Sequence, residues 1–443
     1  MDIFSILCCL TPCLNNTTLR HLAIIVTAIL SMPDRVTMLG ISRWTEKGGS
    51  YRTIQRFFKT KIDWAKVQWI FIRTHLLENS GVTLLGGDEV VTPKAGKKTY
   101  GLGRFFSSIY GKPIPGMCHL HLSLISVEKE TSYPLITQQM QQSEKAKSKK
   151  SKSLQSKSKR KTKKKKVGRP KGSRNKNRRN VELTETQKIL QENIRKALDL
   201  VGNTLKLDYF VYDGALGHNN GVRLVRQCGL HLISKLRYDA ALYFPYDGPY
   251  SGKGPHKKYG DRLDYTNIPK QYLKSSTVED DIRTDIYQMT MRHKKFANQL
   301  NIVIIFKTNL KTLKTAHAVL FSSDLELAYD KLIKYYRLRF QIEFNFRDAK
   351  QYWGLDDFMN IKEQQVCNAA NLAFFMVNVS HILRRRPEFL GMSVIDLKAW
   401  FRAGRYVRET LKLLPQIPEG ISIQSIANQV AVLGRVNTPE EVV

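Results

Sequence analysis

The stretch Tyr336–Lys350 reads YRLRFQIEFNFRDAK and places four positive charges, two carboxylates and four aromatic rings within fifteen residues. In a helix, which turns about 100° per residue, four of its polar side chains share a sector about 60° wide: Tyr336, Arg339, Glu343 and Lys350. Beside that sector lies an apolar stripe of Leu338, Ile342, Phe346 and Ala349. We therefore expect a helix over this stretch, within a long helical region from Asp324 to about Gln351, that packs its apolar stripe on a core and holds a narrow polar row along the edge.

An ordinary surface helix is the alternative explanation of this pattern, with a solvated charged face and an ion pair between Arg339 and Glu343. Three observations favour a functional site. The polar row is narrow, it contains a tyrosine, and two aspartates upstream occupy strand-like segments. Phe340 and Phe344 fall on the polar side of the helix, and the pattern does not explain them.

Two strand aspartates precede this helix in the chain. Asp88 follows an apolar run in LLGGDEVV, and its neighbour Glu89 must point to the opposite face because side chains alternate along a strand. Asp213 ends the short buried strand of DYFVYDG, just before a glycine. A turn or helix-capping aspartate is the alternative interpretation of Asp213.

Together, Asp88, Asp213 and Glu343 offer three carboxylates to two divalent metal ions about 3.5–4 Å apart. Hard oxygen ligands suit Mg²⁺ or Mn²⁺, and a pair of such ions stabilises the attacking and leaving oxygens in phosphoryl transfer. The phosphates and sugars around the scissile bond would be contacted by the other members of the polar row: Tyr336, Arg339 and Lys350.

The charge balance indicates a polyanionic partner. Lys and Arg total 72 against 38 Asp and Glu, which gives a net charge of +34 in a chain of 443 residues. A tract from Lys145 to Arg179 holds 19 of these basic residues and no acid, so the rest of the chain keeps a net charge of +15. Such a field attracts nucleic acid, and DNA or RNA is the expected partner.

The basic tract has too few apolar residues to form a core, so it is predicted to be disordered when free. Within it, KVGRPKGSRNK resembles an AT-hook, in which an extended Arg-Pro segment lies in a narrow A·T-rich minor groove. Its candidate DNA contacts are Arg169, Lys171 and Arg174. The alternative is a solvated polybasic linker that binds DNA without sequence preference.

Composition divides the chain into a helical N-terminal domain, a catalytic α/β domain and a helical C-terminal tail. The expected bounds are 1–77, 82–384 and 385–443 for these domains, with the basic linker at 141–180 and a β-rich insertion at 240–300. A strand over NIVIIFKT is expected to lead directly into the long helix. In the N-terminal domain, RWTEKGGSYRTIQRFF fits either a DNA-contacting helix or simple packing.

The sequence also disfavours several other kinds of site and protein. The CCLTPC cluster has no nearby second ligand pair, and HLH at His119 and His121 lacks further ligands at fixed spacing, so no zinc site is expected. Six scattered cysteines indicate a reduced, cytosolic protein. With DNA as the expected partner, the expected location is cytoplasmic and nucleoid-associated. No membrane span is expected, because HLAIIVTAILSM is shorter than the roughly 20 residues required and NAANLAFFMVNVSHILR reads as a core helix.

The arrangement Tyr336-(2)-Arg339-(3)-Glu343-(6)-Lys350 is similar, in residue type and spacing, to the Y-R-E-K signature of insertion-sequence transposases of the IS-four group. These proteins belong to the DDE superfamily. The resemblance implies an α/β fold with an RNase H-like mixed sheet, flanking helices and a β-rich insertion between the second Asp and the Glu. It also implies that the segment from 82 to 384 supplies the catalytic triad.

The same resemblance implies an enzyme that uses two Mg²⁺ or Mn²⁺ ions to cleave DNA at the element's terminal inverted repeats and then joins the freed 3′ ends to target DNA. A homodimer would hold the paired ends. Some relatives stack a Trp on a flipped base, but this chain has no Trp between Trp69 and Trp353, which leaves Tyr243, Phe244 or Tyr246. Two alternatives stay open: a DNA-binding protein without catalysis, and an RNase H-like nuclease that cuts without joining.

Overall fold

The structure is a computed structural model that describes residues 2–33, 35–46, 48–77, 81–107, 110–141, 182–250, 252, 254–415 and 422–433. The predicted basic linker, from residue 142 onward, lies outside the described residues. Arg169, Lys171 and Arg174 lie outside them as well.

Five strands form the centre of the molecule. β1 (Thr83–Pro93) pairs antiparallel with β3 (Lys112–Ser126), which pairs antiparallel with β4 (Thr131–Met140). On its other side β1 pairs parallel with β5 (Tyr209–Val211), which pairs parallel with β6 (His231–Leu236). The resulting order β4-β3-β1-β5-β6, with three antiparallel strands followed by two parallel ones, is the RNase H-like sheet that the sequence predicted. The short β2 (Gly103–Ser107) pairs with the first residues of β3.

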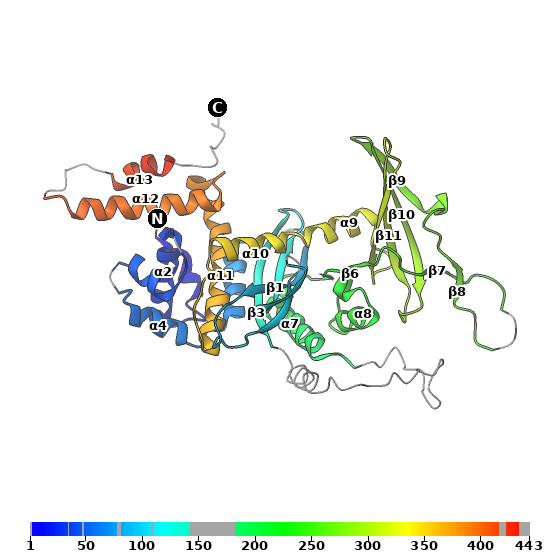
Figure 1. Cartoon of the computed structure of the whole chain (residues 1–443), viewed down its shortest axis with the longest axis horizontal. Coiled ribbons are helices and arrows are strands. Elements are labelled where there is room, and N and C mark those ends of the chain that lie inside the picture. The colour runs from blue at the N-terminus through cyan, green and yellow to red at the C-terminus, as the bar shows by residue number, and fades with distance from the viewer. Residues whose placement is uncertain are drawn as a thin grey trace, which may run out of the picture.

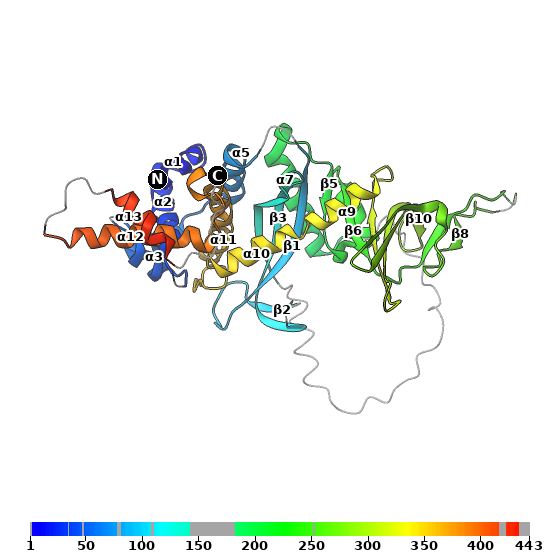
Figure 2. The same ribbon diagram turned by 90° about the horizontal axis from the view of Figure 1, so that it is seen from above.

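Helices cover both faces of this sheet, which explains why its strands are nearly continuous apolar runs. α7 (Glu185–Val201) and α8 (Asn219–Arg226) pack on one face, and α9 (Tyr329–Leu338) and α10 (Gln341–Gln351) pack on the other. Figure 2 shows α10 and α9 running across the sheet over β1 and β6. Successive residues of β1 therefore enter opposite halves of the core.

The predicted single helix over the signature is wrong at one point. α9 ends at Leu338 and α10 begins at Gln341. Arg339 and Phe340 keep right-handed helical dihedrals, but their amides bond three residues back, to Tyr336 O at 3.3 Å and Arg337 O at 3.0 Å. A 3₁₀-like turn winds more tightly than an α-helix, so the polar row is not a straight line along one helix.

The insertion is β-rich, as predicted, but its strands extend beyond the predicted bounds of 240–300. Its strands are β7 (Leu242–Pro245), β8 (Tyr259–Arg262), β9 (Leu273–Glu279), β10 (Ile282–His293), β11 (Leu300–Asn309) and β12 (Thr315–Ser322). The expected direct passage from NIVIIFKT to the helix is wrong, because β12 intervenes and pairs antiparallel with both β11 and β6. The insertion is therefore a continuation of the catalytic sheet.

The N-terminal helices lie at the end of the molecule opposite the insertion (Figure 1). They are α1 (Ile3–Leu7), α2 (Asn16–Ser31), α3 (Met38–Trp44), α4 (Tyr51–Lys59) and α5 (Trp64–His75). Trp64 Nε1 donates to Asn368 Oδ1 at 2.8 Å, and the Asn368 amide donates to carbonyls at the C-terminal end of α4, those of Phe58 and Thr60. This helical end therefore shares one hydrophobic core with the sheet.

The C-terminal part supplies the helices that join these two regions. They are α11 (Glu363–Arg384), α12 (Val394–Lys412) and α13 (Ile423–Val432). In the described part of the chain, α11 is the one helix long and apolar enough to cross a membrane, and 89% of its most apolar window is buried inside the protein. That burial confirms the prediction of a core helix over NAANLAFFMVNVSHILR.

Candidate active site

Asp88 lies on β1 at the point where α10 comes closest to the sheet. Gly86 permits this approach, since a Cβ there would lie 2.5 Å from Ile125 Cδ1 and 2.8 Å from Ile342 Cδ1. Two residues further on, Asp88 points to the same face, toward α10. Glu89 points to the other face, where its Oε2 lies 3.8 Å from the Sγ of Cys118, as the alternation predicted.

Asp213 reaches the same place from the next strand. β1 and β5 run parallel with Gly86 opposite Val211, so Asp88 and Asp213 each lie two residues beyond a paired position and share a face of the sheet. The alternative turn role also exists, because Asp213 Oδ1 accepts from the amide of Ala215 at 2.9 Å. Ser234 Oγ on β6 donates to the Asp213 carbonyl at 2.6 Å, which fixes the main chain there.

Glu343 and Arg339 complete the cluster from the helical side. Arg339 Nη1 donates to Asp88 Oδ2 at 2.5 Å, and its Nη2 donates to Glu343 Oε1 at 2.9 Å. The Arg339 side chain is only 14% exposed. The Arg339–Glu343 ion pair of the surface-helix explanation is therefore present, but it lies in a partly buried cluster that also contains Asp88.

These groups line a cleft of about 650 Å³. Its lining includes all three acids of the predicted triad together with Arg339 and Lys350. Lys350 Nζ donates to the carbonyl of Val91 on β1 at 2.8 Å. Tyr336 is half-buried nearby, and burial raises the pKa of its hydroxyl while neighbouring Arg339 opposes that rise.

Burial dominates the electrostatics of Asp88. It raises the pKa of the Asp88 carboxyl to about 6, with Arg339 opposing the rise and the carboxylates of Asp213 and Glu343 adding to it. The carboxylates of Asp213 and Glu343 disfavour ionisation of Asp88, so removing Arg339 would raise the pKa of Asp88 further. The guanidinium therefore offsets part of the negative charge of Asp88 and Glu343.

The donor set fits hard divalent cations. Carboxylate oxygens from β1, from the end of β5 and from α10 open into one cleft, which is the chemistry that Mg²⁺ and Mn²⁺ prefer. As they are arranged, no group of three or more His, Cys, Asp or Glu side chains within the described ranges is positioned to hold a metal ion. Arg339 separates two of the three carboxylates that would converge.

One acidic residue of the cleft has no signal in the sequence. Asp356, in the turn after α10, lines the cleft, and its Oδ1 is buried without a hydrogen-bond partner in the described part of the chain. Burial raises the pKa of Asp356, and Lys350 and Lys94 oppose that rise. Neither periodicity nor spacing distinguishes Asp356 in YWGLDDF from an ordinary turn aspartate.

The histidines of β3 are packing residues, as predicted. His121 is fully buried and its two ring nitrogens lie within hydrogen-bond distance of Thr137 Oγ1 and Ser123 Oγ, at 2.8 and 2.9 Å. Burial lowers the pKa of His119 to about 4 and that of His121 to about 3, so both rings are neutral at pH 7. The rings of Tyr243 and Phe244, suggested as base-stacking groups, pack against Tyr259 and Tyr272 within the insertion.

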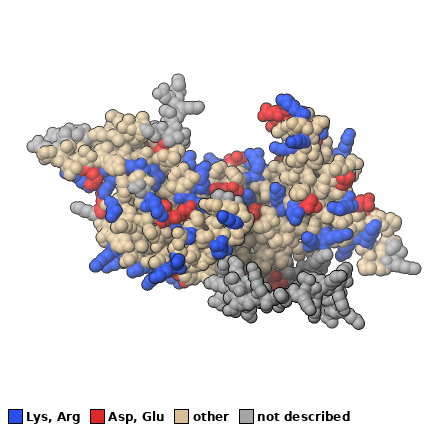
Figure 3. Space-filling view, in the orientation of Figure 1, with Lys and Arg blue, Asp and Glu red and all other residues tan. Residues whose placement is uncertain are grey.

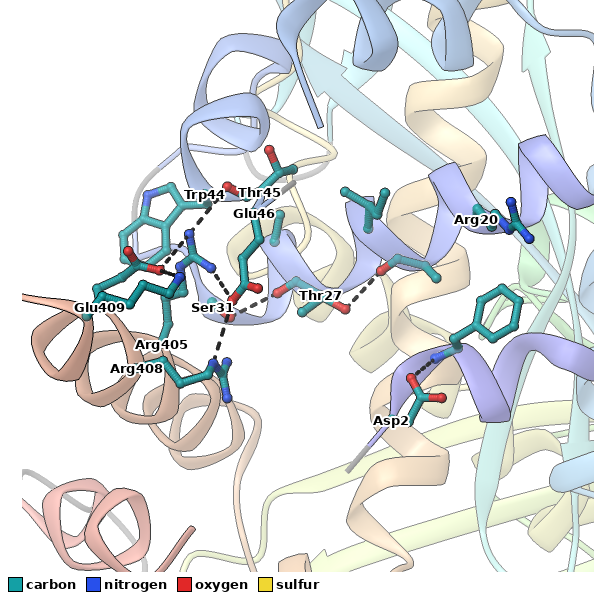
Figure 4. Close-up of a pocket in the computed structure, with 15 residues that line it drawn as sticks. Asp2, Arg20, Thr27, Ser31, Trp44, Thr45, Glu46, Arg405, Arg408 and Glu409 are labelled. Atoms are coloured by element: carbon teal, nitrogen blue, oxygen red, sulfur yellow. Dashed lines mark hydrogen bonds and ion pairs between the residues drawn. The ribbon is translucent and has the colours of Figure 1, made fainter. Parts of the chain in front are cut away.

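A second cavity, of about 850 Å³, lies between α2, α3 and α12 (Figure 4). The charged side chains that α12 contributes to it are paired with one another or with Glu46. Arg405 bonds to Glu46 and, at 3.3 Å, to Glu409, while Arg408 Nε lies 3.6 Å from Glu46. These pairs connect α12 to the loop after α3, so we assign the cavity to the packing of the helical end.

An RNase H-like sheet with acids from β1, the end of β5 and a helix after the insertion defines a nuclease-like fold with an acidic cleft. A family model described as DDE superfamily endonuclease matches residues 9–295, and the chain belongs to this family. The matched segment includes Asp88 and Asp213 and ends before Glu343.

Among solved structures, the chain is similar to a piggyBac transposase in a cryo-EM synaptic complex with hairpin DNA. The identity is 11% and the TM-score 0.39, over 92% of this chain and 78% of that one. No curated protein matches the chain.

Proposed function

We propose that this protein is a DNA transposase of the IS-four type, which cleaves the ends of an insertion sequence and joins the freed 3′ ends to target DNA. The observation that carries the proposal is that Asp88, Asp213 and Glu343 all line one cleft, although they lie 125 and 130 residues apart in the chain. Membership of the DDE superfamily endonuclease family supports the same chemistry.

In this proposal the three carboxylates hold two Mg²⁺ or Mn²⁺ ions. The ions, when bound, would activate a water or a 3′-hydroxyl and stabilise the attacking and leaving oxygens. In the first reaction a water oxygen attacks the scissile phosphorus and a 3′-hydroxyl leaves. In the second, that 3′-hydroxyl attacks a target phosphodiester, so one bond forms as another breaks. Arg339, Lys350 and Tyr336 position the phosphates on either side.

DNA is the proposed partner because of the distribution of positive charge. Figure 3 shows Lys and Arg side chains over the helical end and over the insertion. On α4, which lies in the helical end, Arg52, Arg56 and Lys59 are exposed while Ile54, Phe57 and Phe58 are buried. Lys and Arg that neutralise phosphates make binding dependent on salt. A homodimer on paired DNA ends and a cytoplasmic, nucleoid-associated location belong to the same proposal.

The substitution Glu343→Gln tests the assignment. It removes a charge but keeps the size of the side chain, so metal-dependent nicking of DNA that carries the element's inverted repeats should fall to background. DNA binding, measured by gel shift, should stay close to that of the unmodified protein.

The matched control is Glu326→Gln, which neutralises an exposed acid outside the cleft and should nick normally. Persistent nicking by Glu343→Gln would contradict the assignment of Glu343 to the catalytic site. Nicked DNA without joined product in the unmodified protein would favour the nuclease alternative, and binding without any nicking would favour the non-catalytic one.

A further inference from the structure

The Arg339 guanidinium lies where a divalent cation would have to bind. One cationic group bridges Asp88 Oδ2 and Glu343 Oε1, two of the three proposed metal ligands. Hydrogen bonds between charged groups are roughly twice as strong as neutral ones, and a partly buried pair is screened less by salt than an exposed one. A metal ion must therefore displace Arg339 from these oxygens before it can bind them.

We propose that Arg339 is the counter-ion of the metal-free site, that it competes with divalent cations for Asp88 and Glu343, and that a DNA phosphate relieves this competition by binding Arg339. DNA binding and metal binding are then coupled through one side chain. This inference rests on the proposed function, because it takes the two carboxylates to be metal ligands.

A second observation supports the movement of Arg339 toward a phosphate. In the described part of the chain its Nε is buried and has no hydrogen-bond partner, although both Nη atoms are paired. Guanidinium presents five donors in a planar fork, and a buried donor without a partner is costly. Once Arg339 turned away from the carboxylates and toward the cleft, a phosphate there would offer an oxygen to this Nε, which Asp88 and Glu343 leave without a partner.

The position of Arg339 in the chain fits the same role. It lies in the two-residue turn between α9 and α10, so its side chain leaves from a junction and not from the middle of a regular helix. Lys350, on the same wall of the cleft, is held by the Val91 carbonyl and can stay there while Arg339 moves. Among the cations of the cleft, Lys350 is thus fixed to the main chain, whereas Arg339 is bound to the two carboxylates.

Coupling of this kind is reciprocal. If DNA raises the affinity for the metal by some factor, the metal must raise the affinity for DNA by the same factor, and such factors are typically about 5 to 150. Without DNA the protein should bind Mn²⁺ weakly. With DNA it should bind Mn²⁺ at least about tenfold more tightly.

The experiment titrates Mn²⁺ into the full-length protein by isothermal titration calorimetry, with and without a saturating DNA duplex at low salt. Arg339→Ala should bind Mn²⁺ without DNA at least about tenfold more tightly than the unmodified protein, and DNA should add little further. The matched control is Arg337→Ala, which removes the same charge from an exposed position two residues away and should behave like the unmodified protein.

A second measurement, of the melting temperature, is needed because Arg339→Ala could lose its fold. In this variant the carboxylates repel one another. Mn²⁺ should raise the melting temperature of this variant more than that of the unmodified protein. Arg339→Lys keeps the charge but cannot bridge both carboxylates as a fork does, so its Mn²⁺ affinity should fall between the two.

Each other outcome is decisive. Suppose that Arg339→Ala and the unmodified protein bind Mn²⁺ equally well and that Asp88→Asn does not bind it. That result would contradict the proposed competition by Arg339 but would still support Asp88 as a metal ligand. Weaker Mn²⁺ binding by Arg339→Ala would also overturn it, because Arg339 would then assist the metal. Absence of Mn²⁺ binding in every protein, with and without DNA, would overturn both this inference and the metal-dependent function.

Discussion

In the part of the chain that the structure describes, three buried or partly buried lysines are held by main-chain carbonyls. Lys350 donates to one carbonyl of β1, Lys94 to the carbonyls of two residues in the turn after α10, and Lys398 to one carbonyl each from α2 and from the end of α10. Carbonyl oxygens stabilise an ammonium only in part, so burial lowers the pKa of Lys94 to about 8 and that of Lys398 to about 7.

Lys398 should make stability depend on pH. Its pKa is lower in the folded protein than in the unfolded chain, so the unfolded chain binds more protons between about pH 7 and the ordinary lysine value near 10.5. Stability therefore rises with pH in that range. Lys398→Met removes this contribution, and its stability relative to the unmodified protein should fall by about 1–2 kcal/mol between pH 7 and pH 9.

Urea unfolding at the two pH values measures this difference. Lys59→Met, which changes an exposed lysine, should show no such change with pH. A constant difference between Lys398→Met and the unmodified protein would mean that Lys398 is not charged differently in the two states.

At the same scale, the acids of the cleft were predictable to different degrees. Asp88, Asp213 and Glu343 could be found because a strand period and a helical spacing each leave a signal in the sequence. Asp356 could not, because it enters the cleft through a turn, whose course depends on how α10 packs and not on any local period. The pairing of Arg339 with Asp88 spans 251 residues and is equally invisible in the sequence.

At the scale of elements, the approach of α10 to β1 decides the geometry of the cleft. Gly86 allows that approach, and Ile342, one residue before Glu343, fills the space that a side chain on Gly86 would take. The strand and the helix are each predictable from their apolar patterns. Their contact depends on the missing Cβ, since a strand residue of any other type would hold the helix further away.

Gly86→Ala should therefore separate α10 from β1. The added methyl group would overlap two isoleucine side chains, and overpacking of this kind costs about 1–3 kcal/mol. We expect a lower melting temperature and, because Glu343 moves away from Asp88, slower DNA nicking.

The control for this change is Gly404→Ala in α12. A Cβ there meets no atom closer than 3.6 Å, so the variant should be as stable as the unmodified protein or up to about 1 kcal/mol more stable. Normal stability and nicking in Gly86→Ala would show that the helix can shift without affecting the cleft.

Two features of the fold, β12 and the break between α9 and α10, could not be predicted from the sequence, for physical reasons. β12 begins exposed and ends fully buried, so its sequence shows neither a clean alternation nor a uniform apolar run. The break between α9 and α10 involves residues with helical dihedrals, and only the hydrogen-bond pattern changes. Local sequence preferences do not distinguish these cases, because pairing and packing with distant segments decide them.

At the scale of the whole molecule, the positive charge divides between the basic tract and the remainder of the chain, 19 and 15 net charges. Both parts can release counterions from DNA, and the number released sets how steeply binding falls with salt. The tract should therefore contribute to affinity without deciding which DNA ends are cut.

Replacing residues 145–179 with a Gly-Ser linker of equal length should weaken DNA binding and flatten its dependence on salt. Nicking at saturating DNA should persist, because the three proposed catalytic acids lie elsewhere. Fluorescence anisotropy between 50 and about 200 mM salt measures the slope. An unchanged slope would show that the tract does not contact DNA.

The pairing of β12 with β6 has a mechanical consequence. Residue Phe321 of β12 lies opposite Ser234 of β6, whose hydroxyl binds the main chain of Asp213. The insertion is thus joined to the catalytic sheet by strand pairing, and not by a hinge. The pairs of β10 with β11, β11 with β12 and β12 with β6 link the insertion to Asp213, so a force applied to the insertion would be transmitted to this member of the proposed catalytic triad.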